Sequence, residues 1–233
     1  MRVAITTKQL ETEYGGTVDI LETEYTQYYP KFGITLVPIP NSLENPAEYL
    51  EELGVEGVIL TGGNGVHPSL YGQEMKFPNK WSLDRERTEK AIVDYAIEKK
   101  LPILGICRGL HYLNVHFAGS LLQSIKDETN SQVKHVAAEH EVILTDDQTK
   151  KFFGLEKVLV NSYHNQAILP EILSSQLKAF AVCSSDETIE AAYHPDYPIA
   201  AVTWHPERIK LGDTAFNDKL VRAFVNRELF WEK

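Results

Sequence analysis

Residues 101–110 read Leu-Pro-Ile-Leu-Gly-Ile-Cys-Arg-Gly-Leu, an apolar run that leads into the pattern Gly-x-Cys-x-Gly. An apolar strand, this pattern and a helix in succession form the thiol counterpart of the nucleophile elbow, in which a reactive side chain sits on a sharp turn. The small residues Gly105 and Gly109 let neighbouring chain pass close to that turn. The helix amino terminus favours thiolate over thiol at Cys107 and leaves the backbone N–H of Arg108 free to stabilise an oxyanion. The stretch predicts a strand that presents a nucleophile; the alternative is a core thiol between two packing glycines.

Strands and helices alternate on both sides of this stretch, up to about residue 119. Short apolar runs predict strands at Val3–Thr6, Ile34–Ile39, Val55–Leu60 and Ile103–Ile106. Helical spacing of apolar residues predicts helices at residues 18–32, Pro46–Leu53, Thr88–Lys99 and Leu110–Phe117. This alternation implies an α/β three-layer sandwich with a mostly parallel central sheet and helices on both of its faces.

The second part of the chain differs, because short β-rich runs follow one another with little helical pattern between them. They lie at Glu141–Leu144, Lys157–Val160, Ala179–Cys183, Ile189–Ala192 and Ile199–Trp204. These runs predict hairpins that form a small β extension of the sheet. An amphipathic helix is expected over Asn217–Leu229, and residues 1–233 are interpreted as one domain.

Composition limits the class of protein. The 233 residues carry a formal net charge of −10, which argues against a nucleic-acid partner and disfavours an anionic membrane. The two cysteines cannot make a disulfide framework, and no CxxC pair is present. The first residues lack the apolar core and cleavage site of a signal peptide, and no run is long enough to span a membrane. A cytoplasmic location is therefore expected, where a free thiol stays reduced.

A thiol nucleophile needs a base, and one histidine is well placed to serve. The apolar run Ile199–Trp204 ends in His205-Pro206-Glu207, so a strand would deliver His205 to the edge of the sheet. Pro206 keeps the chain extended, and residues two apart in an extended chain face the same way. Glu207 can then hold the imidazole of His205 in one tautomer and stabilise its charged form. Taken alone, the tripeptide could equally be an ordinary strand-ending turn.

Together, these segments resemble a known family. Gly-Ile-Cys-Arg-Gly at 105–109 and Trp-His-Pro-Glu at 204–207 look like the class I glutamine amidotransferases. The glycine-rich segment 58–72 and the segment 160–166 (Val-Asn-Ser-Tyr-His-Asn-Gln) extend the likeness, which is closest to the stand-alone γ-glutamyl hydrolase branch, peptidase C26. The resemblance implies a glutamine amidotransferase-like, flavodoxin-like fold and hydrolysis of a γ-glutamyl amide.

The resemblance also implies roles for single residues. Cys107 would attack the γ-glutamyl carbonyl, His205 would transfer the proton, and Glu207 would orient His205. A γ-glutamyl thioester would form and would then be hydrolysed to glutamate, without a cofactor. The backbone N–H groups of Arg108 and Gly63 would hold the oxyanion.

Five further residues are expected to line the substrate site, namely Gly62, Asn64, His111, His164 and Gln166. A plain tight turn remains the alternative for the glycine loop, and an exposed turn for His164 and Gln166. Amidotransferases commonly carry glutamine at the position of His111, and Asn64 with Gly65 replaces a more usual Pro-Asp. These departures leave the leaving group open between a γ-glutamyl-aminobutyrate-like amide and a γ-glutamyl phosphoramidate nucleotide.

Two alternatives to a stand-alone hydrolase share the same fold. A glutaminase subunit that delivers ammonia to a separate synthase would use the same three residues, and a silent binding module would keep only the fold. The small-molecule substrate is the expected partner, and the family is compatible with a homodimer. No metal is expected, because His135 and His140 have no third ligand at a recognisable spacing.

Overall fold

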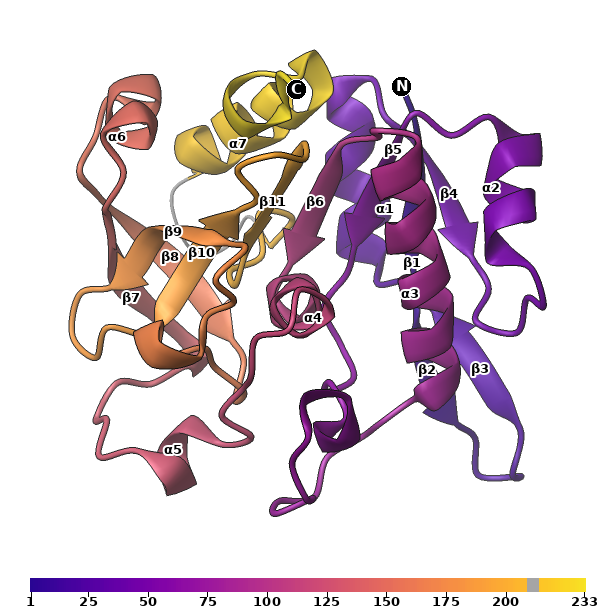
Figure 1. Ribbon diagram of the computed structural model, residues 1–233, viewed down its shortest axis with the longest axis horizontal. Coiled ribbons are helices and arrows are strands. Elements are labelled where there is room, and N and C mark those ends of the chain that lie inside the picture. Colours follow the sequence, from indigo (N-terminus) through magenta and orange to yellow (C-terminus); the bar gives the residue numbers. More distant parts are fainter. Residues whose placement is uncertain (209–213) are drawn as a thin grey trace.

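The computed structural model describes residues 1–208 and 214–233. Its strands, in chain order, are β1 Arg2–Thr6, β2 Lys8–Glu11, β3 Thr17–Ile20, β4 Thr35–Ile39, β5 Gly57–Leu60, β6 Ile103–Ile106, β7 Val136–Leu144, β8 Lys157–Tyr163, β9 Lys178–Cys183, β10 Ile189–Tyr193 and β11 Ile199–Val202. Within these residues, nine strands form one sheet in the order β4-β1-β5-β6-β11-β10-β9-β7-β8 (Figure 1). The neighbours from β4 to β11 pair in parallel, and those from β11 to β8 pair antiparallel.

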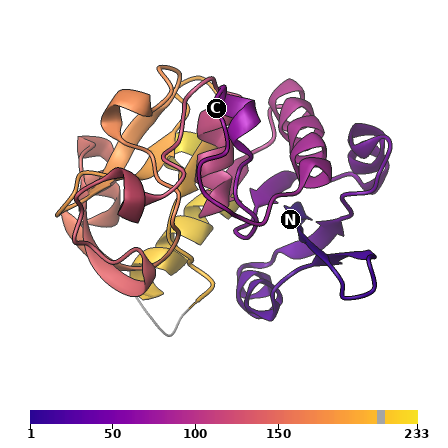
Figure 2. The ribbon, with the colours of Figure 1, turned by 90° about the horizontal axis from the view of Figure 1, so that it is seen from below.

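Helices cover both faces of the sheet. They are α1 Thr23–Tyr28, α2 Pro46–Leu53, α3 Leu83–Glu98, α4 Arg108–His116, α5 Ile125–Glu128, α6 Asp147–Phe153 and α7 Thr214–Asn226, with short 3₁₀ helices at Tyr29–Phe32, Pro68–Tyr71, Pro170–Ile172 and Leu229–Trp231. Helices α1 and α7 lie on one face, and α2, α3 and α4 lie on the other (Figures 1 and 2). The predicted three-layer α/β architecture is confirmed. In the described residues, no helix is both long and apolar enough to cross a membrane.

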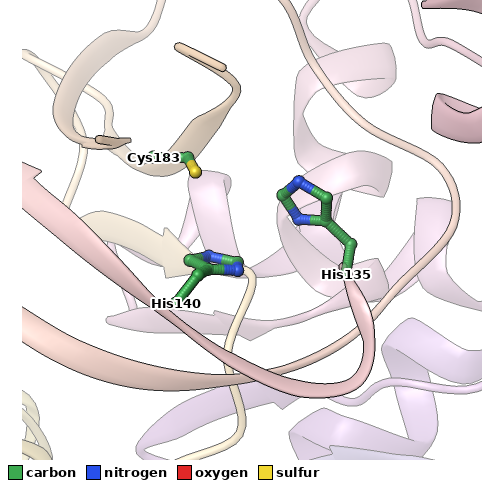
Figure 3. Close-up of side chains that lie close together, drawn as sticks. All are labelled: His135, His140 and Cys183. Carbon is green, nitrogen blue, oxygen red and sulfur yellow. The ribbon is translucent and has the colours of Figure 1, made fainter. Parts of the chain in front are cut away.

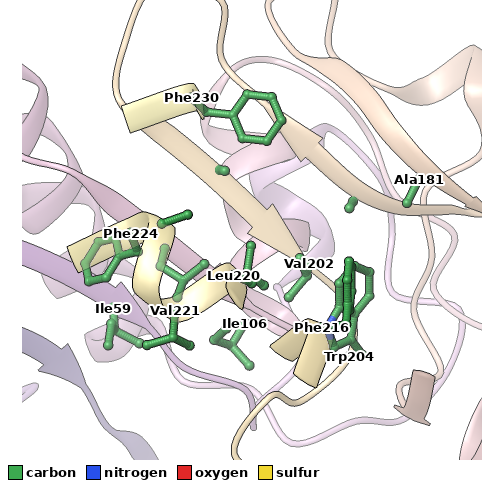
Figure 4. Close-up of a cluster of buried hydrophobic side chains, with 14 of the residues drawn as sticks. Ile59, Ile106, Ala181, Val202, Trp204, Phe216, Leu220, Val221, Phe224 and Phe230 are labelled. Atoms are coloured by element: carbon green, nitrogen blue, oxygen red, sulfur yellow. The ribbon is translucent and has the colours of Figure 1, made fainter. Parts of the chain in front are cut away.

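The core is divided by the sheet into two apolar clusters. Side chains alternate along each strand, so Ile59 packs with α7 while Leu60 packs toward α4 on the other face. On the α7 face, Leu220 and Phe224 are fully buried over Val202 and its neighbours (Figure 4). Each such side chain stabilises the fold by about 1.5–3 kcal/mol through the removal of apolar surface from water. The central strands are therefore buried on both faces of the sheet.

The predicted β extension is also present. Strands β7 to β10 form antiparallel pairs that continue the sheet beyond β11, as the short β-rich runs indicated. Helix α6 lies between β7 and β8 and was not predicted from the sequence. It begins with an N-cap at Asp146, whose side chain accepts a hydrogen bond from the backbone N–H of Thr149.

The prediction of one helix over residues 18–32 is wrong. Val18 lies in β3, which pairs with β2 in a hairpin where Leu10 is opposite Val18. The helix begins only at Thr23, and α1 ends at Tyr28, two residues before Pro30. Proline at this position lacks the N–H that an α-helix would need, so a 3₁₀ turn follows.

Helix α3 also begins earlier than predicted, at Leu83 instead of Thr88. Its first turn is polar and carries no apolar periodicity. The signal that marks its start is Ser82, whose side chain accepts a hydrogen bond from the backbone N–H of Arg85.

Candidate active site

The cysteine lies on a strained turn, as the elbow pattern predicts. Strand β6 ends at Ile106, Cys107 has φ 53° and ψ −106°, and α4 begins at the next residue. Such a conformation costs a non-glycine residue about 1–3 kcal/mol and persists only where packing enforces it. Space around the turn is tight, since a Cβ at Gly105 would lie 2.6 Å from the Cβ of Ala201, and one at Gly109 would lie 2.6 Å from the carbonyl oxygen of Leu60. Glycine is therefore required on both sides of the cysteine.

Parallel pairing brings the histidine to the cysteine. Strands β6 and β11 are neighbours, with Ile106 opposite Val202, so both chains leave the sheet at the same edge. This edge, at the carboxyl ends of the strands, is where open α/β sheets place their sites. The Nδ1 atom of His205 lies 2.5 Å from Oε1 of Glu207, and both residues are buried. The carboxylate fixes the tautomer of the ring and leaves Nε2 facing away from it.

The glycine loop after β5 lies against both His205 and Cys107. A Cβ at Gly62 would lie 2.8 Å from Cε1 and 3.4 Å from Nε2 of His205, and 3.5 Å from the Cβ of Cys107. Imidazole and cysteine therefore flank one glycine. Three segments separated by more than 40 residues along the chain thus converge at one point of the sheet edge.

The electrostatics favour an ion pair between the two groups. Burial opposes ionisation of the thiol, but the His205 imidazolium beside it outweighs burial and lowers the pKa of Cys107. Burial likewise opposes protonation of the ring, but the charges of Glu207 and Cys107 raise the pKa of His205 to about 10. The pair can therefore hold thiolate and imidazolium at neutral pH, a nucleophile together with a proton donor.

The predicted oxyanion donors lie beside this pair. The backbone N–H of Arg108, at the first residue of α4, contributes to the lowered pKa of Cys107. The amide of Gly62 donates to the Tyr25 hydroxyl at 3.1 Å, and Gly63 follows with φ 117°, a conformation that only glycine adopts easily. The Gly62 amide is therefore occupied by Tyr25. That the Gly63 amide is the oxyanion donor of the loop stays a prediction.

Arg85 holds the glycine loop in place, a role that the sequence analysis missed. Its Nη1 donates to the carbonyl of Gly62 at 2.9 Å, and its Nη2 donates to the carbonyl of Thr61 at 2.7 Å. Its Nε donates to Glu89 at 2.8 Å, and both Arg85 and Glu89 are fully buried. No pattern in the sequence marks this arginine, because a buried guanidinium and an exposed one look alike on a helix.

The side chain of Arg108 is tied to the same carboxylate. It donates a hydrogen bond to Glu89, and its Nη2 lies 3.7 Å from Oε1 of Glu86. Both arginines and both glutamates are at most 4% exposed. Removal of one member of such a buried group leaves an uncompensated charge and costs about 3–5 kcal/mol. The network joins the first turn of α4, which carries the nucleophile, to α3 and to the glycine loop.

Two of the expected substrate residues are engaged in loop structure. The amide of Asn64 exchanges hydrogen bonds of 3.0 and 2.8 Å with the backbone of Gln9 on the β2–β3 hairpin. The amide of Gln166 pairs with the backbone of Val66 at 2.9 and 3.2 Å. Both residues therefore shape the wall of the site, and direct contact with substrate stays a prediction for them.

The two histidines expected at the site lie beside each other. The rings of His111 and His164 are 5.7 Å apart, and the charge of His164 contributes to the lowered pKa of Cys107. Burial lowers the pKa of His111 to about 3, with a further contribution from His164, so this ring is neutral. Burial opposes the charge on His164, but Glu190 raises the pKa of His164. Glu190 therefore favours the charged form of His164, which adds to the effect of His205 on the pKa of Cys107.

Comparisons with known proteins show the family of this chain. Residues 3–207 match the model of the peptidase C26 family. The chain is 35% identical to the γ-glutamyl-CDP-amidate hydrolase of Campylobacter jejuni over 73% of this chain and 71% of that protein. It is 30% identical to the γ-glutamyl-γ-aminobutyrate hydrolase of Escherichia coli over 83% of this chain and 80% of that protein.

Solved structures confirm the fold. The glutaminase domain of Trypanosoma brucei CTPS, solved with bound acivicin, superposes with a TM-score of 0.67 at 15% identity, over 99% of this chain and 96% of that one. With the family match over most of its length, the chain belongs to the peptidase C26 family, the hydrolases of the class I glutamine amidotransferase-like fold.

Proposed function

We propose that this chain hydrolyses γ-glutamyl amides through a covalent thioester on Cys107. The observation that carries the proposal is the convergence of Cys107 and His205 on Gly62, with Glu207 at 2.5 Å from the imidazole. Two relatives that match most of the chain act, by name, on different γ-glutamyl compounds. What those compounds share is the γ-glutamyl group, so the acyl part of the substrate is the part that we assign.

The first half-reaction follows from the charges already present. The Cys107 thiolate attacks the γ-carbonyl carbon, and the carbonyl oxygen becomes an oxyanion near the backbone N–H groups of Arg108 and Gly63. Loss of one such donor typically costs about 3 kcal/mol of barrier. As the carbon–nitrogen bond breaks, the His205 imidazolium gives its proton to the leaving nitrogen, and a γ-glutamyl thioester remains.

The second half-reaction uses the same groups in reverse. Neutral His205 takes a proton from water, and the hydroxide so formed attacks the thioester carbonyl. The carbon–sulfur bond breaks, glutamate leaves, and the thiolate–imidazolium pair is restored. Glu207 holds the ring orientation in both steps, because its carboxylate stays on Nδ1 while Nε2 exchanges the proton.

Glutamate release from a panel of compounds tests this function. The panel contains γ-glutamyl-γ-aminobutyrate, a γ-glutamyl phosphoramidate nucleotide and glutamine. We expect release from at least one of the first two, its loss in Cys107→Ala, and a loss of several orders of magnitude in His205→Gln. His116→Gln, which changes an imidazole at the far end of α4, is the matched control and should retain the rate.

Two results would overturn the proposal. Unchanged release in Cys107→Ala would remove the covalent mechanism. Turnover of glutamine alone, and only with an added synthase, would favour the glutaminase subunit instead. Mass spectrometry of the quenched reaction gives an independent reading, because the thioester adds one γ-glutamyl group to the peptide that contains Cys107.

A further inference from the structure

A second cluster of reactive side chains lies in the β extension, behind His164. It contains His135, just before β7, His140 within β7, Cys183 at the end of β9 and Glu190 in β10. All four are at most 8% exposed. Figure 3 shows the imidazoles of His135 and His140 and the sulfur of Cys183 gathered around one small space.

Strand pairing brings these residues together. Val142 is opposite Cys183, and His140 lies two residues before Val142, on the same face of β7. The register of β7 against β8 shifts between Val136 and Ala138, and the residue between them, Ala137, has φ 52°. This irregularity separates His135 from the regular strand and leaves it beside the two other side chains. His140 lies 5 residues after His135, and Cys183 lies 43 residues after His140, so the three meet only in the folded chain.

Each imidazole has a carboxylate near one of its ring nitrogens, as metal-ligating histidines often do. The Nε2 atom of His135 lies 2.9 Å from a carboxylate oxygen of Asp186, and the Nε2 atom of His140 lies 3.4 Å from one of Glu190. The contact with Asp186 fixes the tautomer that offers Nδ1 of His135 to a metal. Nδ1 of His135 and both ring nitrogens of His140 are buried and have no hydrogen-bond partner in the structure. Buried polar atoms are almost always satisfied, so these nitrogens point to an absent ligand.

The charges point the same way. The carboxylates of Asp186 and Glu190 lie against these imidazoles. In the part of the chain that the structure describes, their ion-pair partners are histidines, and neither lysine nor arginine takes part. Carboxylates in this position are the usual partners of metal-ligating histidines.

We propose that His135, His140 and Cys183 bind a divalent transition-metal ion, with zinc as the ion that suits them best. Their ligand atoms all lie within 4.8 Å of one another. Zinc–nitrogen and zinc–sulfur bonds of about 2.0–2.3 Å place tetrahedral ligand atoms roughly 3.3–3.8 Å apart, so small side-chain rotations close the site. Two imidazoles and a thiolate select zinc over magnesium or calcium. On binding, the Cys183 thiol releases its proton to solvent and the sulfur–metal bond replaces the sulfur–hydrogen bond.

The metal site is distinct from the catalytic thiol. The sequence suggested no metal because His135 and His140 lacked a third ligand at a recognisable spacing, and the fold supplies that ligand from β9. The ion would link β7 to β9, next to β8, which leads into His164. We therefore expect it to stabilise the segment that carries His164, and its presence does not depend on the proposed hydrolysis.

Cobalt substitution tests the site with a spectroscopic readout. The Cys107→Ala variant removes the other thiol, so any thiolate-to-cobalt charge-transfer absorption must come from Cys183. Chelator-stripped protein is titrated with Co²⁺ alone. We expect one ion per chain, a charge-transfer band with tetrahedral d–d bands, and a higher midpoint of thermal unfolding when Zn²⁺ replaces Co²⁺.

Matched variants locate the ion. Added to this background, Cys183→Ser should abolish the charge-transfer band, and His140→Gln should weaken Co²⁺ binding by at least tenfold. His194→Gln, a buried histidine outside the cluster, should change neither. An absence of bound cobalt, or a spectrum that Cys183→Ser leaves unchanged, would overturn the proposal. Should a variant fail to fold, X-ray absorption of the zinc-loaded background protein decides, because a coordination shell without sulfur would equally refute the site.

Discussion

The side-chain amide of Asn161 forms hydrogen bonds with both backbone groups of His205. Its Nδ2 donates to the carbonyl of His205 at 2.8 Å, and the backbone N–H of His205 donates to its Oδ1 at 2.8 Å. Asn161 lies in β8, at the far edge of the sheet from β6, so the segment after β11 that carries His205 is held by the β extension. The backbone position of His205 therefore depends on Asn161, just as its ring orientation depends on Glu207.

Asn161→Ala should reduce kcat by about 10²-fold, because a catalytic group displaced by around 1 Å loses that much. KM should change far less, since the predicted substrate contacts lie elsewhere. The free energy of unfolding should fall by about 1–3 kcal/mol, because two buried backbone groups lose their partners. Steady-state kinetics and urea unfolding measure both effects. Asn130→Ala, at an exposed asparagine, is the control, and a kcat equal to that of wild type in Asn161→Ala would contradict the positioning role.

The two cysteines should differ in reactivity with iodoacetamide. The His205 imidazolium lowers the pKa of Cys107 despite its burial, whereas burial raises the pKa of Cys183 to about 11. Peptide mapping after treatment at neutral pH should find label on Cys107 alone. In Glu207→Gln the imidazolium is less stable, so the pH midpoint of Cys107 labelling should move up toward the ordinary thiol value. An unchanged midpoint would show that Glu207 does not support the charge on His205.

Gly62→Ala should impair catalysis more than folding. The new Cβ would lie 2.8 Å from Cε1 of His205, and the ring cannot retreat easily because Glu207 and Asn161 hold it. We expect kcat to fall at least tenfold, with a change in the free energy of unfolding of about 1–3 kcal/mol from overpacking. Gly16→Ala, at the tip of the β2–β3 hairpin, makes the same substitution away from the site. Equal kcat values in the two variants would contradict the close approach of His205 to the loop.

The His205–Glu207 pair should contribute a stability that is lost as pH rises. Interaction with Glu207 and Cys107 outweighs burial and raises the pKa of His205 from 6.5 to about 10, so the folded state binds a proton that the unfolded state releases. This contribution is fully present below the unfolded pKa of 6.5 and disappears as pH rises through the folded pKa.

A Cys107→Ala background isolates this effect, because the thiolate, whose linkage has the opposite sign, is then absent. In that background, Glu207→Gln should lower the free energy of unfolding more at about pH 6 than at about pH 9. Denaturant unfolding at several pH values measures the difference. A difference that grows with pH would mean that the folded state does not hold the imidazolium.

The sequence by itself determined the parts that depend on neighbours along the chain. Gly105, Cys107 and Gly109 mark a strand, a sharp turn and a helix, and the structure places all three there. The pattern of His205 and Glu207 after an apolar strand likewise predicted a local pair, since residues two apart in extended chain share a face. Alternating strands and helices were enough to predict the parallel layers, because such strands can be connected only across a face of the sheet.

Tertiary structure alone decided which distant side chains meet. Arg85 holds the glycine loop, Asn161 holds His205, and Cys183 lies near two histidines, yet none of these contacts follows from spacing along the chain. Strand order and register fix them, and register is set by how whole strands bury their apolar faces. The same cause separated β3 from the helix predicted over residues 18–32, because pairing with β2 satisfied backbone groups that local periodicity could not assign.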